Sequence, residues 1–438
     1  MKILSLTFGL ATVITANLIA GETLNLKLVP ERELLIRNRP QEVIIKIDLS
    51  AVSDKTRARR TPLNLAVVLD RSGSMSGAKL EKAKQAATML VDRLAPDDVF
   101  SLVAYSDDAR VLVPAQRVED KDALKEKIRR IEADGSTALY AGVKRGAAEI
   151  DEYFSNKRIN RVILLSDGLA NIGPSSPREL RRLGHDLAER GVSVTTIGVG
   201  DDYNEDLMGG LAEASDANYY YVKDTERLPE IFARELGELL TVAARNVRIE
   251  VVCPDGVKPL GFIGRAERFE NQKAVVNLSH FTAGQDRYLM LRCVVDSDRP
   301  EVARVRLAYT DELADGKARV TDGVVTVRFT ADRMDSDRSL NNAVFAEKQL
   351  MLAAVAKDEA MQEADAGNYK KAASILAAQK SELDKSYAAA PAGVQVQIRV
   401  ETNNLDDFAG QLNSGSYGGG MRKSMQSQSY NTRNSKVQ

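Results

Sequence analysis

Apolar and polar residues alternate with a period of two in two separate parts of the chain. The first part lies near the amino end, where Leu24, Leu26 and Leu28 alternate with polar residues, and it extends to residue 51. The second part covers residues 246–330. A period of two predicts strands with one buried and one solvated face. Because a lone hairpin is not stable, we expect both parts to form one β-sandwich; the alternative is that the early strands extend the edge of a neighbouring sheet.

The pattern changes between these two parts, over residues 61–244. Strand-like apolar runs now alternate with amphipathic helical stretches, and the runs are residues 65–69, 99–104, 162–165 and 192–199. Continuous apolar strands separated by helices predict a parallel sheet that is covered on both faces. The expected fold class is therefore α/β, with a doubly wound, mostly parallel sheet. This sheet is inserted in, or flanked by, a β-sandwich made from residues 21–60 and 245–332.

Residues 338–412 have the periodicity of helices and predict a helical hairpin that breaks at residues 366–368, with a possible third helix from residue 394 to 412. The segment Gly-Asn-Tyr-Lys-Lys-Ala after the break resembles one tetratricopeptide unit, and one unit is too few for a solenoid. We therefore expect a docking hairpin. Residues 413–438 are rich in Gly, Ser, Asn and Gln and contain no acidic residue, which predicts a flexible tail. Contact of this basic tail with an anionic surface is the alternative.

The first 20 residues are typical of an export signal. Lys2 precedes a largely apolar stretch, and Ala20 and Gly21 are small enough for cleavage. The alternative is an uncleaved anchor, since the stretch approaches the length that spans a bilayer. No later stretch is long and apolar enough to cross a membrane. We expect an exported protein, periplasmic or secreted.

The composition limits the kinds of partner and metal ligand that the chain can have. The formal net charge is -1, which gives no reason to expect a nucleic-acid partner. With two His and no Trp, few imidazoles are available, so a metal would be held by oxygen atoms, as Mg²⁺, Ca²⁺ and Mn²⁺ are. The two cysteines, Cys253 and Cys293, lie in strand-like segments. They form either one disulfide in an oxidising compartment or two buried free thiols.

Three loops carry oxygen donors that suit a metal ion. The first apolar run of the α/β part ends in Asp70, and Ser72 and Ser74 follow before a helix. Thr137 opens a later helix and Asp167 ends the third apolar run. In open α/β sheets, ligands bind at the carboxyl ends of the strands, where these loops would meet. Two carboxylates and three hydroxyls are hard donors that suit Mg²⁺, or alternatively Mn²⁺ or Ca²⁺. Alternatively, these residues only form turns and helix caps.

Asp70-x-Ser72-x-Ser74, followed by Thr137 and Asp167, resembles the metal-ion-dependent adhesion site of von Willebrand factor A domains. The resemblance covers roughly residues 61–244 and implies that the two serines and the threonine coordinate the metal directly, while the two aspartates often act through water. It also implies one open coordination position, which an Asp or Glu of a partner protein completes. The flanking β segments together with Asp-Arg-Ser-Gly-Ser-Met further resemble bacterial exported proteins similar to inter-alpha-trypsin inhibitor heavy chains. Some of those are labelled calcium-activated chloride channel homologues, but this chain has no pore-forming span.

We therefore expect a non-enzymatic extracytoplasmic protein that binds a partner protein through this site. The alternative is an envelope scaffold or assembly factor that recruits partners through its C-terminal helices, with a purely structural metal. A hydrolase is disfavoured because His185 is expected on a charged helix surface and His280 is expected to be structural, each without a nucleophilic Ser or Cys partner. Tyr219, Tyr220 and Tyr221 are expected to pack at the edge of the sheet. The oligomeric state stays open.

Overall fold

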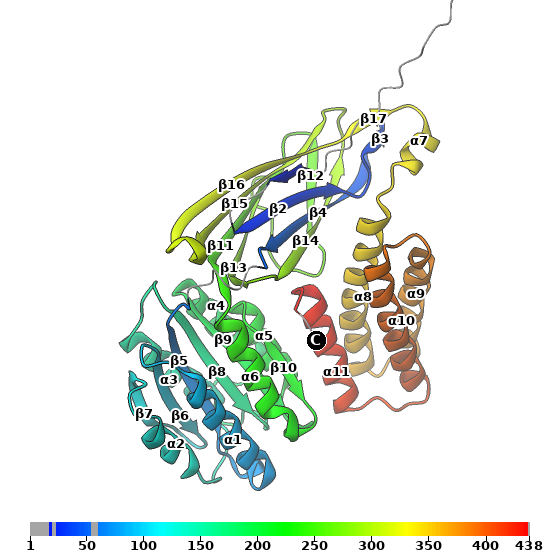
Figure 1. The fold of residues 1–438 in the computed structure, drawn as a ribbon. Coiled ribbons are helices and arrows are strands. Elements are labelled where there is room, and N and C mark those ends of the chain that lie inside the picture. Colours follow the sequence, from blue (N-terminus) through cyan, green and yellow to red (C-terminus); the bar gives the residue numbers. More distant parts are fainter. Residues whose placement is uncertain (1–16, 20–22, 54–59, 437–438) are drawn as a thin grey trace, which may run out of the picture.

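The computed structural model describes residues 17–19, 23–53 and 60–436, and it consists of an α/β unit, a β-sandwich and a group of C-terminal helices (Figure 1). The expected export signal lies outside the described residues, apart from the short strand β1 (Asn17–Ile19), which pairs with the next strand. Among the described residues, no helix combines the length and the apolar character needed to span a membrane.

The α/β unit is built on one six-stranded sheet with the order β10-β9-β8-β5-β6-β7. Its strands are β5 (Leu63–Asp70), β6 (Val99–Tyr105), β7 (Ala109–Arg117), β8 (Ile159–Ser166), β9 (Val192–Val199) and β10 (Tyr219–Val222). All neighbouring strands run parallel except β6 and β7, which are antiparallel. The prediction of a mostly parallel sheet is confirmed.

Helices cover both faces of this sheet. One face carries α1 (Ala78–Arg93), α2 (Lys121–Arg129) and α6 (Leu228–Leu239), and the other carries α3 (Leu139–Glu152), α4 (Pro177–Glu189) and α5 (Glu205–Ala214). The central strand β5 supplies both cores, because Val67 packs on the first face and Ala66 and Val68 on the second. A strand that is buried on both faces explains the continuous apolar run in its sequence.

The sandwich pairs a five-stranded sheet, β1-β2-β4-β14-β12, with a four-stranded sheet, β13-β11-β15-β16. Its strands are β2 (Leu24–Pro30), β4 (Gln41–Ala51), β11 (Val242–Val252), β12 (Val257–Phe262), β13 (Lys273–Thr282), β14 (Asp286–Val295), β15 (Glu301–Asp311) and β16 (Lys317–Thr326). A short parallel pair, β3 (Leu34–Ile36) and β17 (Arg328–Thr330), adjoins it. Because β4 pairs with β14, the prediction of one sandwich interrupted by the α/β unit is confirmed, and the alternative of an extended α/β sheet is wrong.

Both cysteines lie in the core of the sandwich as free thiols. Cys293 is on β14, with its sulfur 3.6 Å from the carbonyl oxygen of Val43, and Cys253 follows β11. Burial raises the pKa of the Cys253 thiol to about 11 and that of the Cys293 thiol to about 12. In this structure the two residues therefore act as small apolar side chains.

The C-terminal part begins with a short helix, α7 (Arg333–Arg338), and continues into the predicted hairpin of α8 (Asn342–Asp365) and α9 (Tyr369–Tyr387). The third helix also forms, as α10 (Ala392–Asn413). These three long helices share an apolar core made mostly of Ala and Leu.

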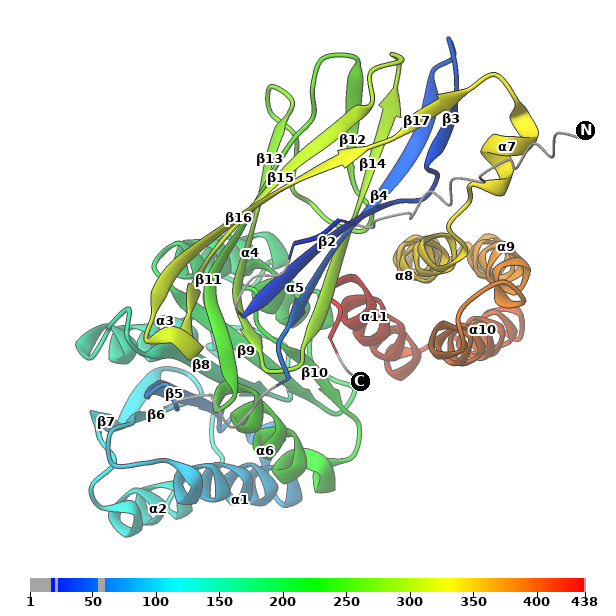
Figure 2. The ribbon, with the colours of Figure 1, turned by 45° about the horizontal axis from the view of Figure 1, so that its top comes forward.

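The predicted flexible tail is wrong, because residues Gly419–Arg433 form a further helix, α11. Figure 2 shows α11 between the α/β unit and the helices α8 to α10. Met425 packs into the core of the C-terminal helices and Tyr430 into that of the α/β unit. Arg422 binds three carboxylates, those of Glu205, Asp206 and Asp365. The basic charge of this segment is thus neutralised by acidic residues of the same chain, which removes the reason to expect an anionic surface as its partner.

Candidate metal centre

The predicted donors lie in three loops at the carboxyl edge of the six-stranded sheet. The first loop follows β5 and contains a short 3-10 turn, Gly73–Met75, before α1. The second precedes α3, and the third follows β8. Two backbone hydrogen bonds tie the first loop to the second: Gly73 donates to the oxygen of Gly135 at 3.0 Å, and Asp134 donates to the oxygen of Arg71 at 2.7 Å. The loops are therefore fixed relative to one another by the main chain.

Asp70 is fully buried at the base of this cluster. Its Oδ1 accepts the backbone N–H of Ser72 at 2.8 Å, and its Oδ2 accepts the hydroxyl of Ser166 at 2.7 Å and that of Tyr105 at 3.3 Å. Burial raises the pKa of the Asp70 carboxyl above its ordinary value, although the hydrogen bonds from the two serines act in the opposite direction. A buried carboxylate of this kind is stabilised by a nearby cation.

The second carboxylate is that of Asp167, which is also fully buried. The hydroxyl of Ser74 donates to its Oδ1 at 2.7 Å, and the oxygens of Ser72 and Ser74 are 3.1 Å apart. Oδ2 of Asp167 accepts a hydrogen bond from the ammonium of Lys79. Ser74 is exposed while both aspartates are buried, so the cluster opens to solvent on the side of the serine.

Thr137 borders the same space. A Cβ at Gly168 would lie 3.3 Å from Oγ1 of Thr137 and 3.5 Å from Oγ of Ser74, so both hydroxyls face this glycine. Asn171 holds the backbone of Thr137 through two hydrogen bonds, at 2.8 and 3.2 Å. Within the described residues, Oγ1 of Thr137 has no hydrogen-bond partner, and the residue is 4% exposed. The Thr137 hydroxyl therefore lies in the cluster without contributing a hydrogen bond to the fold.

The structure brings all five predicted residues together, and their chemistry fits a hard dication. Over the described part of the chain, no group of three or more His, Cys, Asp or Glu side chains could hold a metal ion. A site here would instead combine two carboxylates with three hydroxyls. These are all oxygen donors, which suits Mg²⁺, Mn²⁺ or Ca²⁺ better than softer metals. The assignment of the five residues as ligands stays a prediction.

Sequence reasoning missed three side chains that complete the cluster. Tyr105 and Ser166 hold Asp70, and Lys79 pairs with Asp167. Ser166 precedes Asp167 in the sequence, so its place at the end of β8 could have predicted a hydroxyl in the cluster. Nothing in the local sequence distinguishes Lys79 from the other lysines of α1. Arg71, which lies in the first loop, approaches the backbone oxygen of Glu132 at 3.4 Å.

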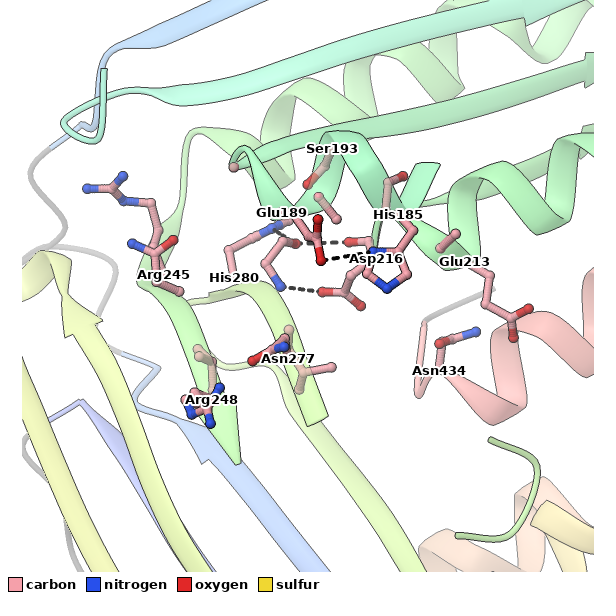
Figure 3. A pocket seen from close by; sticks show the side chains of 18 of the residues that line it. His185, Glu189, Ser193, Glu213, Asp216, Arg245, Arg248, Asn277, His280 and Asn434 are labelled. Atoms are coloured by element: carbon pink, nitrogen blue, oxygen red, sulfur yellow. Dashed lines mark hydrogen bonds and ion pairs between the residues drawn. The ribbon is translucent and has the colours of Figure 1, made fainter. Parts of the chain in front are cut away.

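A cleft of about 1100 Å³ lies between the α/β unit and the sandwich, away from this cluster. Figure 3 shows side chains from α4, such as His185 and Glu189, facing side chains from β11 and β13, such as Arg248 and Asn277. The cleft adjoins the amino ends of β8 and β9, whereas the predicted donors lie at the carboxyl edge. As expected, His185 is on the exposed face of a charged helix, where it approaches Glu189 at 3.7 Å.

The second histidine, His280, has a serine beside it, because Oγ of Ser279 lies 2.8 Å from its Nδ1. The serine hydroxyl also approaches the backbone oxygen of Asp216 at 2.9 Å, and the guanidinium of Arg161 lies 3.3 Å from the same Nδ1. Burial and the charge of Arg161 hold the pKa of His280 well below its ordinary value. The Asp216 carboxylate binds Arg287 and the Ser279 N–H. The imidazole is therefore neutral, and among the described residues no carboxylate accepts a hydrogen bond from it as in a catalytic triad.

Comparisons with known proteins agree with this arrangement. Residues 64–234 match the model of the von Willebrand factor type A domain. The uncharacterized protein sll0103 of Synechocystis is 29% identical over 280 residues, which is 61% of this chain and 66% of the relative. The uncharacterized protein YfbK of Escherichia coli is 27% identical over 63% of this chain and 49% of its own length. Human inter-alpha-trypsin inhibitor heavy chain H4 is 28% identical over 34% of this chain and 17% of its own length.

The similarity to solved structures extends beyond that domain. A von Willebrand factor type A protein from Catenulispora acidiphila matches 95% of this chain and 97% of its own, with a TM-score of 0.72 and 18% identity. The ArnB paralog VWA2 from Sulfolobus acidocaldarius matches 90% of this chain and 100% of its own, with a TM-score of 0.60 and 18% identity. At 18% identity, these two comparisons show the fold of the chain alone, including its sandwich and C-terminal helices. The match to each of the sequence relatives named above spans less than two thirds of that relative's length.

Proposed function

We propose that the von Willebrand factor A domain formed by residues 64–234 holds a divalent cation and uses it to bind a partner protein outside the cytoplasm. The proposed ligands are Asp70, Ser72, Ser74, Thr137 and Asp167, and Mg²⁺ is the expected ion, with Mn²⁺ or Ca²⁺ as alternatives. The observation that carries the proposal is the convergence of three loops that place two buried carboxylates and three hydroxyls in one cluster.

A bound dication would turn this cluster into a site for an acidic side chain. The ion neutralises the two buried carboxylates, and a carboxylate of the partner completes its coordination from the open side at Ser74. Because the surroundings are of low dielectric, the attraction between ion and carboxylate exceeds that in bulk water. The domain itself performs no chemistry in this proposal.

The surface around the cluster supports a protein as the partner. Leu169 and Ile172 follow Asp167 in the same loop and are 58% and 36% exposed. Exposed apolar side chains beside a polar centre are typical of protein interfaces. The expected export signal, and the similarity to the inter-alpha-trypsin inhibitor heavy chains, support a location in the periplasm or outside the cell.

We expect Thr137→Ala to abolish metal-dependent capture of the partner while leaving the fold intact, because Oγ1 of Thr137 makes no hydrogen bond within the described residues. The measurement is a pull-down from the native envelope fraction with Mg²⁺ and with a chelator. Ser136→Ala is the matched control, since within the described residues this half-buried neighbour makes a hydrogen bond only through its backbone N–H, which donates to Asp107. Equal capture by wild type in Mg²⁺ and in chelator, or by both variants, would contradict the proposal.

The scaffold function remains the second candidate because α10 exposes two valines one turn apart, Val396 at 65% and Val400 at 53%. If this face recruits the partner, Val396→Asp with Val400→Asp removes capture while Thr137→Ala and chelator have no effect. The metal-dependent proposal predicts the opposite result for each variant. Substitutions on this surface are preferable to deletion of the C-terminal region, because α11 packs against the α/β unit.

A further inference from the structure

Lys79 places a positive charge inside the proposed metal site. Its ammonium pairs with Oδ2 of Asp167, the carboxylate whose other oxygen accepts the hydroxyl of Ser74. The side chain of Lys79 is 28% exposed and that of Asp167 is fully buried. The ammonium is therefore the counter-ion of a buried carboxylate, and it shares this carboxylate with the predicted dication.

The position of Lys79 in its helix is unfavourable for a cation. It is the second residue of α1, and the amino end of a helix carries a partial positive charge that repels cations. Lys82, one turn further along α1, points instead to Glu226 at the surface. The pairing of Lys79 with Asp167 thus offsets the repulsion from the amino end of the helix. Lys82 lies further along the helix, where this repulsion is weaker.

A second loop borders the ammonium. A Cβ at Gly200, directly after β9, would lie 3.7 Å from Nζ and 3.8 Å from Cε of Lys79. Gly200 has a φ of +72°, a conformation that favours glycine, and its N–H donates to the oxygen of Val222 at 2.9 Å. The end of the lysine side chain is consequently enclosed between Asp167 and a fixed backbone segment.

We propose that Lys79 is a tethered counter-ion that weakens the binding of the dication and gives the loaded site its preference for an acidic ligand. Two carboxylates alone would cancel the charge of a dication. With Lys79 beside Asp167, the loaded site keeps one positive charge, which an entering carboxylate neutralises. In the absence of metal, the same ammonium compensates the buried charge of Asp167. This inference rests on the proposed metal-binding function and assigns to Lys79 the control of its affinity.

The test is the affinity for Mn²⁺, measured by titration calorimetry on the full chain. We expect Lys79→Met to bind Mn²⁺ about tenfold more tightly than wild type, because one repulsive charge is removed. Lys82→Met should bind like wild type, and Lys79→Arg, which keeps the charge, should remain within a few-fold of it. If Lys79 served only to position Asp167, Lys79→Met would bind more weakly. Unchanged or weaker binding by Lys79→Met therefore overturns the inference.

Thermal unfolding in chelator and in Mn²⁺ provides a readout that is independent of affinity. Lys79→Met should unfold at a lower temperature than wild type in chelator, and added Mn²⁺ should raise its unfolding temperature by more than it raises that of wild type. Should Lys79→Met not fold without metal, Lys79→Gln takes its place in both measurements. If wild type itself binds no Mn²⁺, the proposed function fails; if wild type binds and the variants do not differ from it, only the role of Lys79 fails.

Discussion

Asp70→Asn is expected to weaken Mg²⁺ binding by more than about 100-fold and to leave the metal-free protein at least as stable as wild type. The loss follows from removing one of only two carboxylates in the cluster. The unchanged stability follows from the cost of burying a charge, which the amide avoids. The amide oxygen can still accept the N–H of Ser72, and its NH₂ can donate to the hydroxyl oxygen of Ser166.

Asp98→Asn is the matched control for this variant. Asp98 is also fully buried, but it lies at the opposite edge of the sheet, where it accepts the N–H groups of Leu63 at 2.9 Å and Ala95 at 2.8 Å and pairs with Arg60. Its replacement should lower the unfolding temperature in chelator and leave the Mg²⁺ affinity unchanged. Calorimetry for the affinity and thermal unfolding in chelator separate the two effects. Undiminished Mg²⁺ binding by Asp70→Asn would remove this aspartate from the metal centre.

Asp216→Asn is expected to lower the free energy of unfolding by about 3 kcal/mol, because it leaves the charge of Arg287 buried without a partner. Asp216 follows α5 of the α/β unit, and Arg287 lies on β14 of the sandwich, 2.8 Å away. Their side chains are 14% and 4% exposed. Asparagine suits the positive φ of 46° at this position, so the change tests the charge rather than the backbone. Chemical unfolding of the full chain is the measurement.

The exposed pair Arg306 and Asp322 is the control for this ion pair. It is also held by two hydrogen bonds, at 2.7 and 3.2 Å, but its side chains are 60% and 59% exposed. Asp322→Asn should therefore change the stability very little. Equal losses in the two variants would show that burial does not determine the effect.

The buried pair of Asp216 and Arg287 also predicts how the stability of the protein depends on pH. Burial opposes the charged form of Asp216, but Arg287 and Lys436 outweigh it and hold the pKa of the carboxyl well below its ordinary value. A lowered pKa in the folded state contributes stability above the unfolded value, near 4, and this contribution is lost as the pH falls below it. The difference in stability between wild type and Asp216→Asn should accordingly shrink as the pH is lowered from 5 toward 2.

The parts of the molecule that sequence predicted are those encoded locally. The apolar runs of β5, β8 and β9 are buried on both faces, so their periodicity alone indicates a covered parallel sheet. The five donors stand directly after strands or before a helix, and the topology of such a sheet brings those positions to one edge. The resemblance of the spacing to a known site added the expected roles, with the serines and the threonine as direct ligands and the aspartates often acting through water.

The parts that sequence missed depend on partners from distant segments. The segment that forms α11 is polar and basic, and it is helical in the structure because α5 and α8 supply the carboxylates and apolar surfaces that it lacks. Lys79 joins the cluster because α1 packs on one face of the sheet, and Tyr105 joins it because β6 pairs with β5. Ser279 and His280 are neighbours in sequence. The low pKa of His280 depends on Arg161, however, and the Ser279 hydroxyl is held by the backbone of Asp216, and both residues belong to the α/β unit.

The interrupted sandwich has a consequence for the order in which the chain assembles during synthesis. Ser50 of β4 pairs with Asp286 of β14, so the first strands emerge from the ribosome long before their neighbour exists. The α/β unit is contiguous in sequence and can fold during this interval. Until β14 arrives, the apolar face and free edge of β2 and β4 remain open to other chains. The strands β2 and β4 are thus a segment of the nascent chain that a chaperone would shield.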